Sequence, residues 1–131
     1  YGEIYPDGQH NNLKIFDQQI RAFRLWMKEH GEQDKPLIVS EYGIVYRHAG
    51  MEDFYVVRDF MLATFDYFLN TTDGELGYPA DDYRLVQRWA WYSLDDPYIN
   101  RYSYLIDPNT GRLTALGEAY AGYALDHADL P

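Results

Sequence analysis

Hydrophobic residues follow helical spacing in three stretches of the chain. In the first stretch, apolar side chains recur at i, i+4, i+7 and i+11 from Phe16, so they share one face of a helix. Asn11 or Asn12 can cap the start of this helix, and Gly31 can end it. The stretches that we predict to be helices are 12–30, 52–70 and 115–125.

Shorter segments between these helices have the composition of buried strands. The run Leu-Ile-Val at 37–39 is too short for a helix and lies between Pro36 and Gly43. Residues 85–94 form a longer segment rich in aromatic residues, and 102–106 is a short third candidate. Strands that alternate with helices indicate parallel strand–helix–strand units. Because a parallel sheet needs both faces and both edges covered, two long strands indicate a piece of a larger α/β layer.

Composition and charge narrow the range of partners. The 131 residues are 47% hydrophobic, which is enough for the core of one domain. A net charge of -10 argues against a nucleic-acid partner or an anionic membrane, because either would be repelled. No apolar run has the length of a membrane span. The absence of cysteine excludes disulfides, cysteine-based zinc sites and thiol catalysis, but it leaves the compartment open, secretion and the cell surface included.

Aromatic residues make up 18% of the chain, with 14 tyrosines and 3 tryptophans. Aromatic faces suit protein cores and also flat apolar ligands such as sugar rings, so the excess fits both uses. The histidines and aspartates show no ligand spacing on one element, and there is no glycine-rich phosphate loop. No metal and no cofactor are therefore predicted.

Glu41 is the candidate catalytic carboxylate. It stands at the C-terminal end of the first predicted strand, directly before a turn at Gly43. Polar residues at such strand ends form the active sites of parallel barrels. Strand alternation would place Leu37, Val39 and Glu41 on one face, where a carboxylate needs a partner or a ligand. A salt bridge from Glu41 to an arginine, with a purely stabilising role, is the alternative, and position alone favours neither.

Three segments occur in an informative order. Residues 35–43 are Lys-Pro-Leu-Ile-Val-Ser-Glu-Tyr-Gly, residues 88–97 are Arg-Trp-Ala-Trp-Tyr-Ser-Leu-Asp-Asp-Pro, and residues 114–120 are Thr-Ala-Leu-Gly-Glu-Ala-Tyr. They resemble strand seven, strand eight and the final helix of retaining glycoside hydrolases of the large (β/α)8 superfamily often called clan A. The resemblance implies an α/β fold in which residues 1–131 are the C-terminal part of a partial TIM barrel, with parallel strands alternating with helices.

The resemblance also implies an activity. Glu41 corresponds to the nucleophile of a retaining hydrolase of a β-linked oligo- or polysaccharide, which needs two carboxyl groups about 5 Å apart. The acid/base glutamate of the superfamily ends strand four, usually after Asn, and this sequence has no such strand. The chain alone is then expected to be inactive, with an N-terminal portion missing. Its exposed edges are expected to pair with a second copy or with the missing barrel portion. A non-catalytic carbohydrate-binding or structural module is the alternative.

Several aromatic and polar residues are candidates for sugar binding. Aligning by residue type selects Trp91 as the platform under the cleaved sugar, whereas aligning by the serine that follows selects Tyr92, and the inward register stays open. His10 and His48 lie in loops expected at the active-site end, and Tyr42, Tyr46 and Arg47 follow Glu41. Each of these five residues could bind sugar hydroxyls, but an ordinary solvated loop is the favoured interpretation for each.

Overall fold

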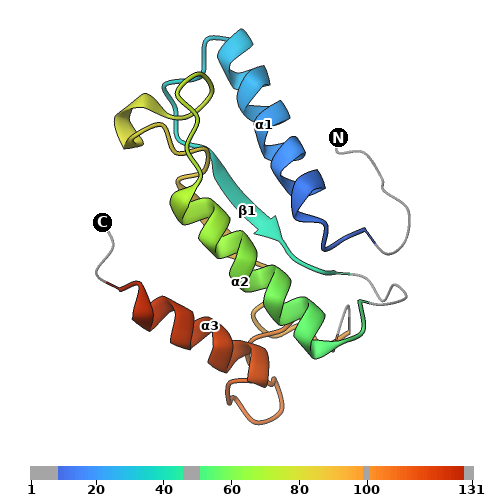
Figure 1. Ribbon diagram of the computed structural model, residues 1–131. Helices are drawn as coiled ribbons and strands as arrows, with labels where there is room; N and C mark the ends of the chain where they lie inside the picture. Colours follow the sequence, from blue (N-terminus) through green and yellow to red (C-terminus); the bar gives the residue numbers. More distant parts are fainter. Residues whose placement is uncertain (1–8, 46–50, 99–100, 129–131) are drawn as a thin grey trace.

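The structure, a computed structural model, describes residues 9–45, 51–98 and 101–128. In this part of the chain, three helices pack with one sheet of two parallel strands (Figure 1). The elements in chain order are α1 (Leu13–Glu29), β1 (Ile38–Tyr42), α2 (Phe54–Asn70), the single 3-10 turn η1 (Pro79–Asp81), β2 (Arg88–Trp91) and α3 (Ala115–Asp126).

The prediction of a partial TIM barrel is wrong. The described residues form a small α/β domain with a two-stranded sheet, and the eight alternating units of a barrel are absent from them. The predicted strand 85–94 is reduced to the four residues of β2, and 102–106 forms no strand. The reason is backbone pairing between segments that lie apart in the sequence. The N–H of Leu105 donates to the carbonyl of Ser93, and that of Ile106 to Leu94, so this segment folds back on the end of β2.

The three predicted helices are confirmed, with their ends shifted by one or two residues. Asn12 caps α1, because its side-chain oxygen accepts from the backbone N–H of Lys14 at 3.0 Å and of Ile15 at 3.4 Å. Gly31 follows the helix with φ of +74°, a left-handed conformation that glycine adopts without a steric penalty. The start and end signals in the sequence therefore act as expected.

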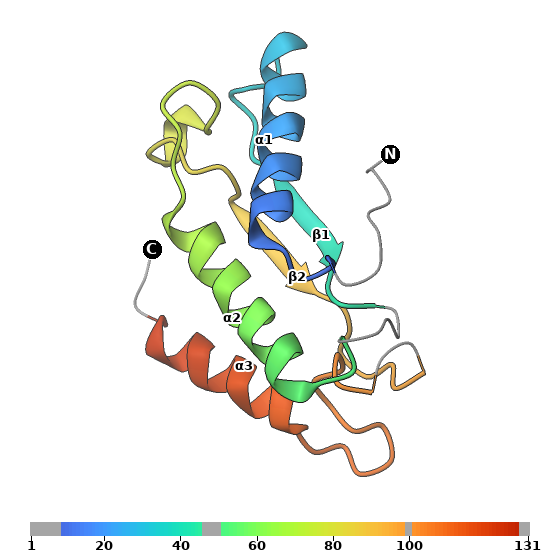
Figure 2. The same ribbon diagram turned by 45° about the vertical axis from the view of Figure 1, so that its right-hand side comes forward.

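Helices cover only one face of the sheet. β1 and β2 are parallel, and α2 forms the connection between them. In both ribbon views, α1 and α2 pack over the strands and α3 lies beside α2 (Figures 1 and 2). The opposite face is open, and the Ile38 side chain on β1 is 55% exposed. A two-layer domain results, in which one sheet face remains available to solvent.

An irregularity in β1 decides which side chains reach the core. Val39 pairs with Trp89 and Tyr42 with Trp91, so three steps along β1 match two steps along β2. The predicted alternation, with Leu37, Val39 and Glu41 on one face, is therefore wrong at its last position. Leu37 and Val39 do belong to the buried side, but Tyr42 takes the next inward position and Glu41 is exposed.

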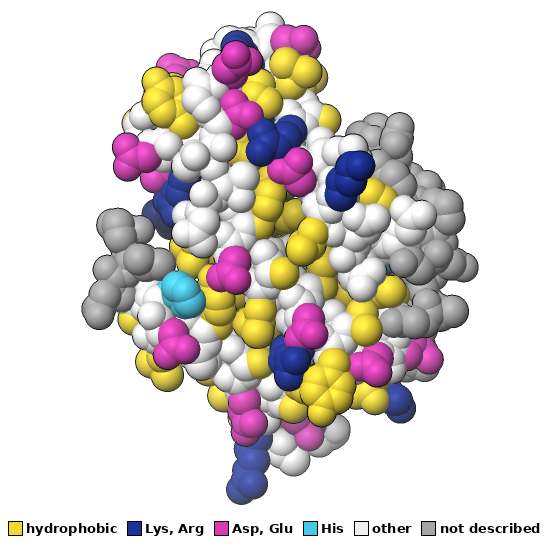
Figure 3. All heavy atoms as spheres, viewed as in Figure 1, with side chains coloured by type: hydrophobic (Ala, Val, Ile, Leu, Met, Phe, Trp, Pro, Cys, Tyr) yellow, Lys and Arg dark blue, Asp and Glu magenta, His cyan; other side chains and the backbone are white. Residues whose placement is uncertain are grey.

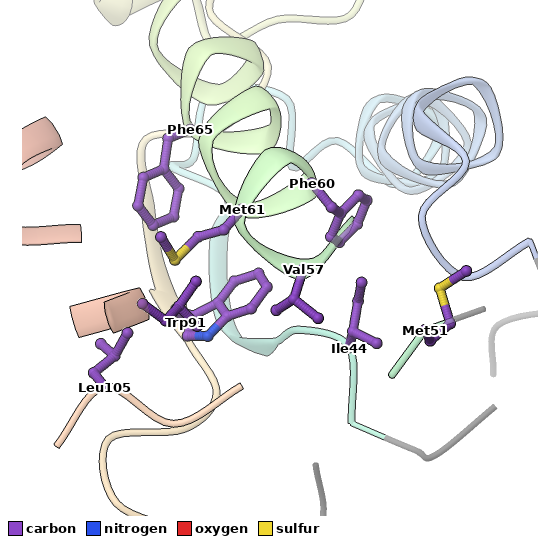
Figure 4. Close-up of a cluster of buried hydrophobic side chains, with 9 residues drawn as sticks. Ile44, Met51, Val57, Phe60, Met61, Phe65, Trp91 and Leu105 are labelled. Atoms are coloured by element: carbon purple, nitrogen blue, oxygen red, sulfur yellow. The ribbon is translucent and has the colours of Figure 1, made fainter. Parts of the chain in front are cut away.

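Tyr42 is the centre of an aromatic layer between the sheet and the helices. Its ring meets Phe68 and Trp91 edge to face, with centroids 5.3 and 5.4 Å apart, and its hydroxyl lies 3.0 Å from that of Thr64. Burial raises the pKa of the Tyr42 hydroxyl well above its usual range. Figure 4 shows part of the larger buried cluster. Its members are Ile44, Met51, Val57, Phe60, Met61, Phe65, Trp91, Leu105 and Leu116.

Arg24 joins the N-terminal ends of both strands to α1. Its side chain is 0% exposed, and its guanidinium donates to the carbonyls of Leu85 (2.6 Å) and Lys35 (3.0 Å) and to the side-chain oxygen of Gln87. The same Gln87 oxygen accepts from the backbone N–H of Leu37 at 2.8 Å. Burial lowers the pKa of Arg24 from its usual value. These bonds satisfy backbone groups just before β1 and β2, so one side chain aligns both strands.

A second polar cluster fixes α1 against α2. Asp17 accepts from the Tyr67 hydroxyl at 2.8 Å and from Arg21 at 2.8 Å, and Arg21 also forms an ion pair with Asp73 in the loop after α2. Burial, followed by the bond to Asp17, raises the pKa of Tyr67 above its usual range. Both polar clusters therefore lie on the covered side of the sheet.

The helical side of the molecule has a mixed surface. In Figure 3, acidic, basic and apolar side chains are interspersed over this face, and the acidic residues do not gather in one place. Among the described residues, no helix is both long enough and apolar enough to cross a bilayer.

Replacing Arg24 with Met is expected to lower the free energy of unfolding by about 2–4 kcal/mol, because one buried and two partly buried acceptors lose a charged donor. Urea titration of the whole chain measures the loss. The control is Arg112→Met, because Arg112 is exposed, and it should change stability by less than about 0.5 kcal/mol. Equal effects of the two substitutions would contradict the role assigned to Arg24.

Candidate functional site

The candidate site lies where β1 and β2 end. Glu41 is the next-to-last residue of β1, and its side chain is exposed. Tyr92 follows β2 directly and is half-buried. A hydrogen bond to Asp96, then burial, then the charges of Asp96, Glu41 and Asp95 raise the pKa of the Tyr92 hydroxyl. Glu41 thus lies within electrostatic reach of Tyr92, although the two residues are 51 positions apart in sequence.

The structure separates the two aromatic residues that the sequence left open as sugar platforms. Trp91 is 7% exposed, belongs to the buried cluster, and donates its indole N–H to the carbonyl of Ser103 at 2.8 Å. Its ring points toward the helices (Figure 4). Tyr92, one position later, has its hydroxyl beside the turn that follows β2. Of the two, only Tyr92 combines partial exposure with proximity to Glu41.

Gly43 allows the two strand ends to approach closely. A Cβ atom at this position would lie 2.5 Å from the backbone carbonyl oxygen of Tyr92, which is closer than real Cβ atoms come to any atom. Next to it, the N–H of Tyr92 donates to the carbonyl of Tyr42 at 2.7 Å. Together these contacts fix the backbone of Tyr92 relative to Glu41, two residues before the glycine. The sequence indicated a turn at Gly43 but not this contact.

Asp96 organises the turn after β2. Its carboxylate accepts from the Tyr92 hydroxyl at 3.1 Å and from the N–H of Tyr98 at 3.0 Å, and its own N–H donates to the Ser93 hydroxyl at 3.1 Å. The Tyr92–Ser93 peptide bond is cis. A Ser-x-x-Asp sequence indicates a hydrogen-bonded turn, but no sequence pattern indicates that the Asp96 carboxylate also accepts from the Tyr92 hydroxyl.

Ser103 ties this turn to the end of β1. Its hydroxyl donates to the carbonyl of Ile44 at 2.5 Å, and its own carbonyl accepts from Trp91 and from the N–H of Ser93. Ser103 is buried, as is Ser93. Sequence reasoning missed Ser103, because a serine in a turn-rich segment is not distinctive. The supporting contacts of the site are therefore mostly backbone contacts.

The other predicted site residues lie in less suggestive surroundings. Tyr42 packs in the aromatic layer, so its contacts assign it a structural role first, and sugar binding by it stays a prediction. His10 is half-buried in the turn before α1. In both ribbon views, the start of α1 lies at the end of the molecule where β1 also ends (Figures 1 and 2). Tyr46, Arg47 and His48 lie outside the described residues.

Comparison with known proteins was made at three levels: family models, curated proteins and solved structures. No match was found at any of them. The resemblance to glycoside hydrolases therefore rests on the three sequence segments alone.

Glu41 is chemically available at this site. Among the described residues, none forms a salt bridge with Glu41, so the stabilising ion pair considered from the sequence is not found there. The same part of the chain holds no group of three His, Asp or Glu side chains able to bind a metal ion. What the strand ends offer is an accessible carboxylate next to a phenol that is held by a second carboxylate. This combination can act as a nucleophile and can bind hydroxyl groups.

Gly43→Ala is expected to lower the free energy of unfolding by about 1–3 kcal/mol, because the new methyl group meets the Tyr92 carbonyl. Urea denaturation gives the loss, and amide NMR shifts should change most at residues 92–96. Gly74→Ala is the matched control, since a Cβ there meets nothing within 4 Å. A destabilisation of Gly74→Ala as large as that of Gly43→Ala would show that loss of glycine flexibility, rather than the close approach, causes the effect.

Proposed function

We propose that Glu41 is the nucleophile of a retaining glycoside hydrolase that acts on a β-linked oligo- or polysaccharide, and that Tyr92 is its aromatic platform. The observation that carries the proposal is the juxtaposition of an exposed carboxylate and a half-buried tyrosine at the C-terminal ends of two parallel strands. The motif in which Glu41 is followed by Tyr and Gly adds support from the sequence.

The chemistry matches the residue types. A carboxylate oxygen of Glu41 would attack the anomeric carbon as the glycosidic bond breaks, giving a covalent glycosyl ester that water then hydrolyses. A flat aromatic face at the strand end gives the apolar side of a sugar ring a surface on which to stack. The close approach at Gly43 brings the backbone of Tyr92 to the end of β1, and the charge of Glu41 acts on the Tyr92 hydroxyl, so the two side chains are available together.

The reaction needs a second carboxyl group to protonate the leaving oxygen. Asp96 is committed to Tyr92 and to the backbone of its own turn. We therefore propose that the acid comes from polypeptide that covers the open sheet face. Ile38 is half exposed on that face, and parallel strands normally have both faces covered. A second copy of the chain is the alternative source of this cover.

A carbohydrate-binding module without turnover is the second candidate function. The observation that favours it is the commitment of Asp96: one of its carboxylate oxygens accepts from Tyr92 and the other from the backbone of its own turn, so it is not free to protonate a leaving group. Such a module would use Tyr92 for stacking and Glu41 for hydrogen bonds to sugar hydroxyls.

A 2-deoxy-2-fluoro-β-glycosyl fluoride should label Glu41 even in the isolated chain. Fluoride leaves without protonation, so the first step needs the nucleophile but not the acid, and the 2-fluoro group slows hydrolysis of the resulting ester. Intact mass should rise by one fluoroglycosyl unit with at least one reagent of a gluco, galacto, xylo and cellobiosyl panel. Peptide mapping should place the adduct on Glu41. Natural β-glycosides should not be hydrolysed by the chain alone.

Two variants calibrate this labelling. Glu41→Gln should abolish it, whereas Glu52→Gln, at an exposed glutamate just before α2, should leave it unchanged. Labelling that persists in Glu41→Gln, or no labelling by any reagent, would refute a nucleophilic role. Binding of oligosaccharides without labelling would instead favour the binding module.

A further inference from the structure

The orientation of the Tyr92 ring depends on few contacts. Its backbone is held by the bond to Tyr42 and by the close approach of Gly43. A tyrosine side chain still rotates about two bonds when its backbone is fixed. The ring contacts found among the described residues fix Tyr42 and Trp91 tightly, but none of them involves Tyr92. The described contact that acts on the end of the Tyr92 side chain is the hydrogen bond from its hydroxyl to Asp96.

Asp96 is itself rigidly placed. Its N–H donates to the hydroxyl of Ser93, a buried residue, and one of its carboxylate oxygens accepts from the N–H of Tyr98. The other oxygen accepts from Tyr92 at 3.1 Å. Each oxygen thus has a protein donor, and Asp96 lies only four positions after the tyrosine whose ring it holds. Such a short, doubly anchored link is well suited to setting the angle of an aromatic ring.

We propose that Asp96 is a positioning residue that fixes the Tyr92 ring at the angle at which it receives a sugar ring beside Glu41. The inference rests on the proposed function, because it assigns a purpose to the platform of that same site. A ring that is already held at the binding angle loses less conformational freedom when the sugar binds, so the gain appears as affinity. Asp96 acts through Tyr92, since both of its oxygens are already used.

Nuclear magnetic resonance of tyrosine labelled with 13C at Cζ tests the contact without any sugar. The Tyr92 signal is assigned by its loss in Tyr92→Phe. Its titration in the native chain should occur above the ordinary value of about 10. Asp96→Ala and Asp96→Asn should both lower this pKa, since both remove the charge. Asp95→Asn removes an equal charge one residue away and should lower it less, because Asp95 acts on Tyr92 through its charge alone.

Labelling kinetics with the fluoroglycosyl fluoride test the purpose of the contact. The concentration for half-maximal labelling, KI, reports binding, and the limiting rate reports attack by Glu41. Asp96→Ala should raise KI about fivefold, the worth of one hydrogen bond, with little change in the limiting rate. Asp96→Asn should keep KI within about twofold, because its amide keeps a hydrogen bond to Tyr92: when the amide oxygen accepts from the N–H of Tyr98, the NH2 group donates to the hydroxyl oxygen of Tyr92. Comparison of the two variants thus separates the effect of the hydrogen bond on the orientation of the Tyr92 ring from the effect of the Asp96 charge.

A double-mutant cycle shows whether Asp96 acts through Tyr92. Tyr92→Phe keeps the ring but loses the hydroxyl, so it should raise KI about as much as Asp96→Ala. The double variant should be no worse than either single one. Additive effects, or an unchanged KI in Asp96→Ala while its Tyr92 titration shifts, would overturn the inference and leave the proposed function intact. An absence of labelling in the native chain would overturn both, and it would be recognised before any Asp96 variant is compared.

Discussion

Burial of the Tyr42 ring is the constraint on which the arrangement of the strand ends depends. The helices cover only one face of a sheet that is two strands wide, and an aromatic layer fills the space between this face and the helices. Tyr42 enters that layer between Phe68 and Trp91. To do so, β1 gains one residue relative to β2, and the extra step turns Glu41 away from the core. The position of the candidate nucleophile is therefore a consequence of core packing.

The N-terminal ends of the two strands are held by hydrogen bonds rather than by apolar packing. There, the buried Arg24 and the side chain of Gln87 satisfy backbone groups that the short strands leave unpaired. Apolar packing near Tyr42 and hydrogen bonding near Arg24 thus fix the two ends of the same sheet. The packing around Tyr42 and the hydrogen bonds of Arg24 both lie on the covered side of the sheet. The backbone of the open face is therefore positioned by contacts made on the opposite face. A site on that face can change its side chains with little effect on the core.

The sequence predicts the helices well because their spacing and caps are local properties. Asn12 and Gly31 act at the ends of α1 as their residue types suggest. The extent of the fold could not be predicted in the same way. Composition predicted a strand over 85–94, and the resemblance predicted that this strand belongs to a barrel. Instead, pairing of Ser93 with Leu105 ends β2 early. Such pairing depends on residues that lie ten or more positions apart.

Prediction of the site was limited in the same way, because local features are visible in the sequence and contacts between distant segments are not. Glu41 could be selected because it follows an apolar strand, which is visible in sequence. The choice between Trp91 and Tyr92 depended on which residue turns toward the helices, and only the pairing register decides this. The contacts of Gly43 and Ser103 depend on chain segments that meet only in the folded state.

The outward position of Glu41 and Tyr92, with Tyr42 and Trp91 turned inward, is the central claim of this account. Paramagnetic relaxation by a neutral, soluble gadolinium chelate tests it most directly, because NMR signals broaden with their exposure to solvent. Signals of Glu41 and of the Tyr92 ring should broaden, while those of Tyr42 and of the Trp91 indole should resist. Trp26, which is 49% exposed on α1, is the internal reference. Broadening of Trp91 equal to that of Trp26, with Tyr92 protected, would contradict the account.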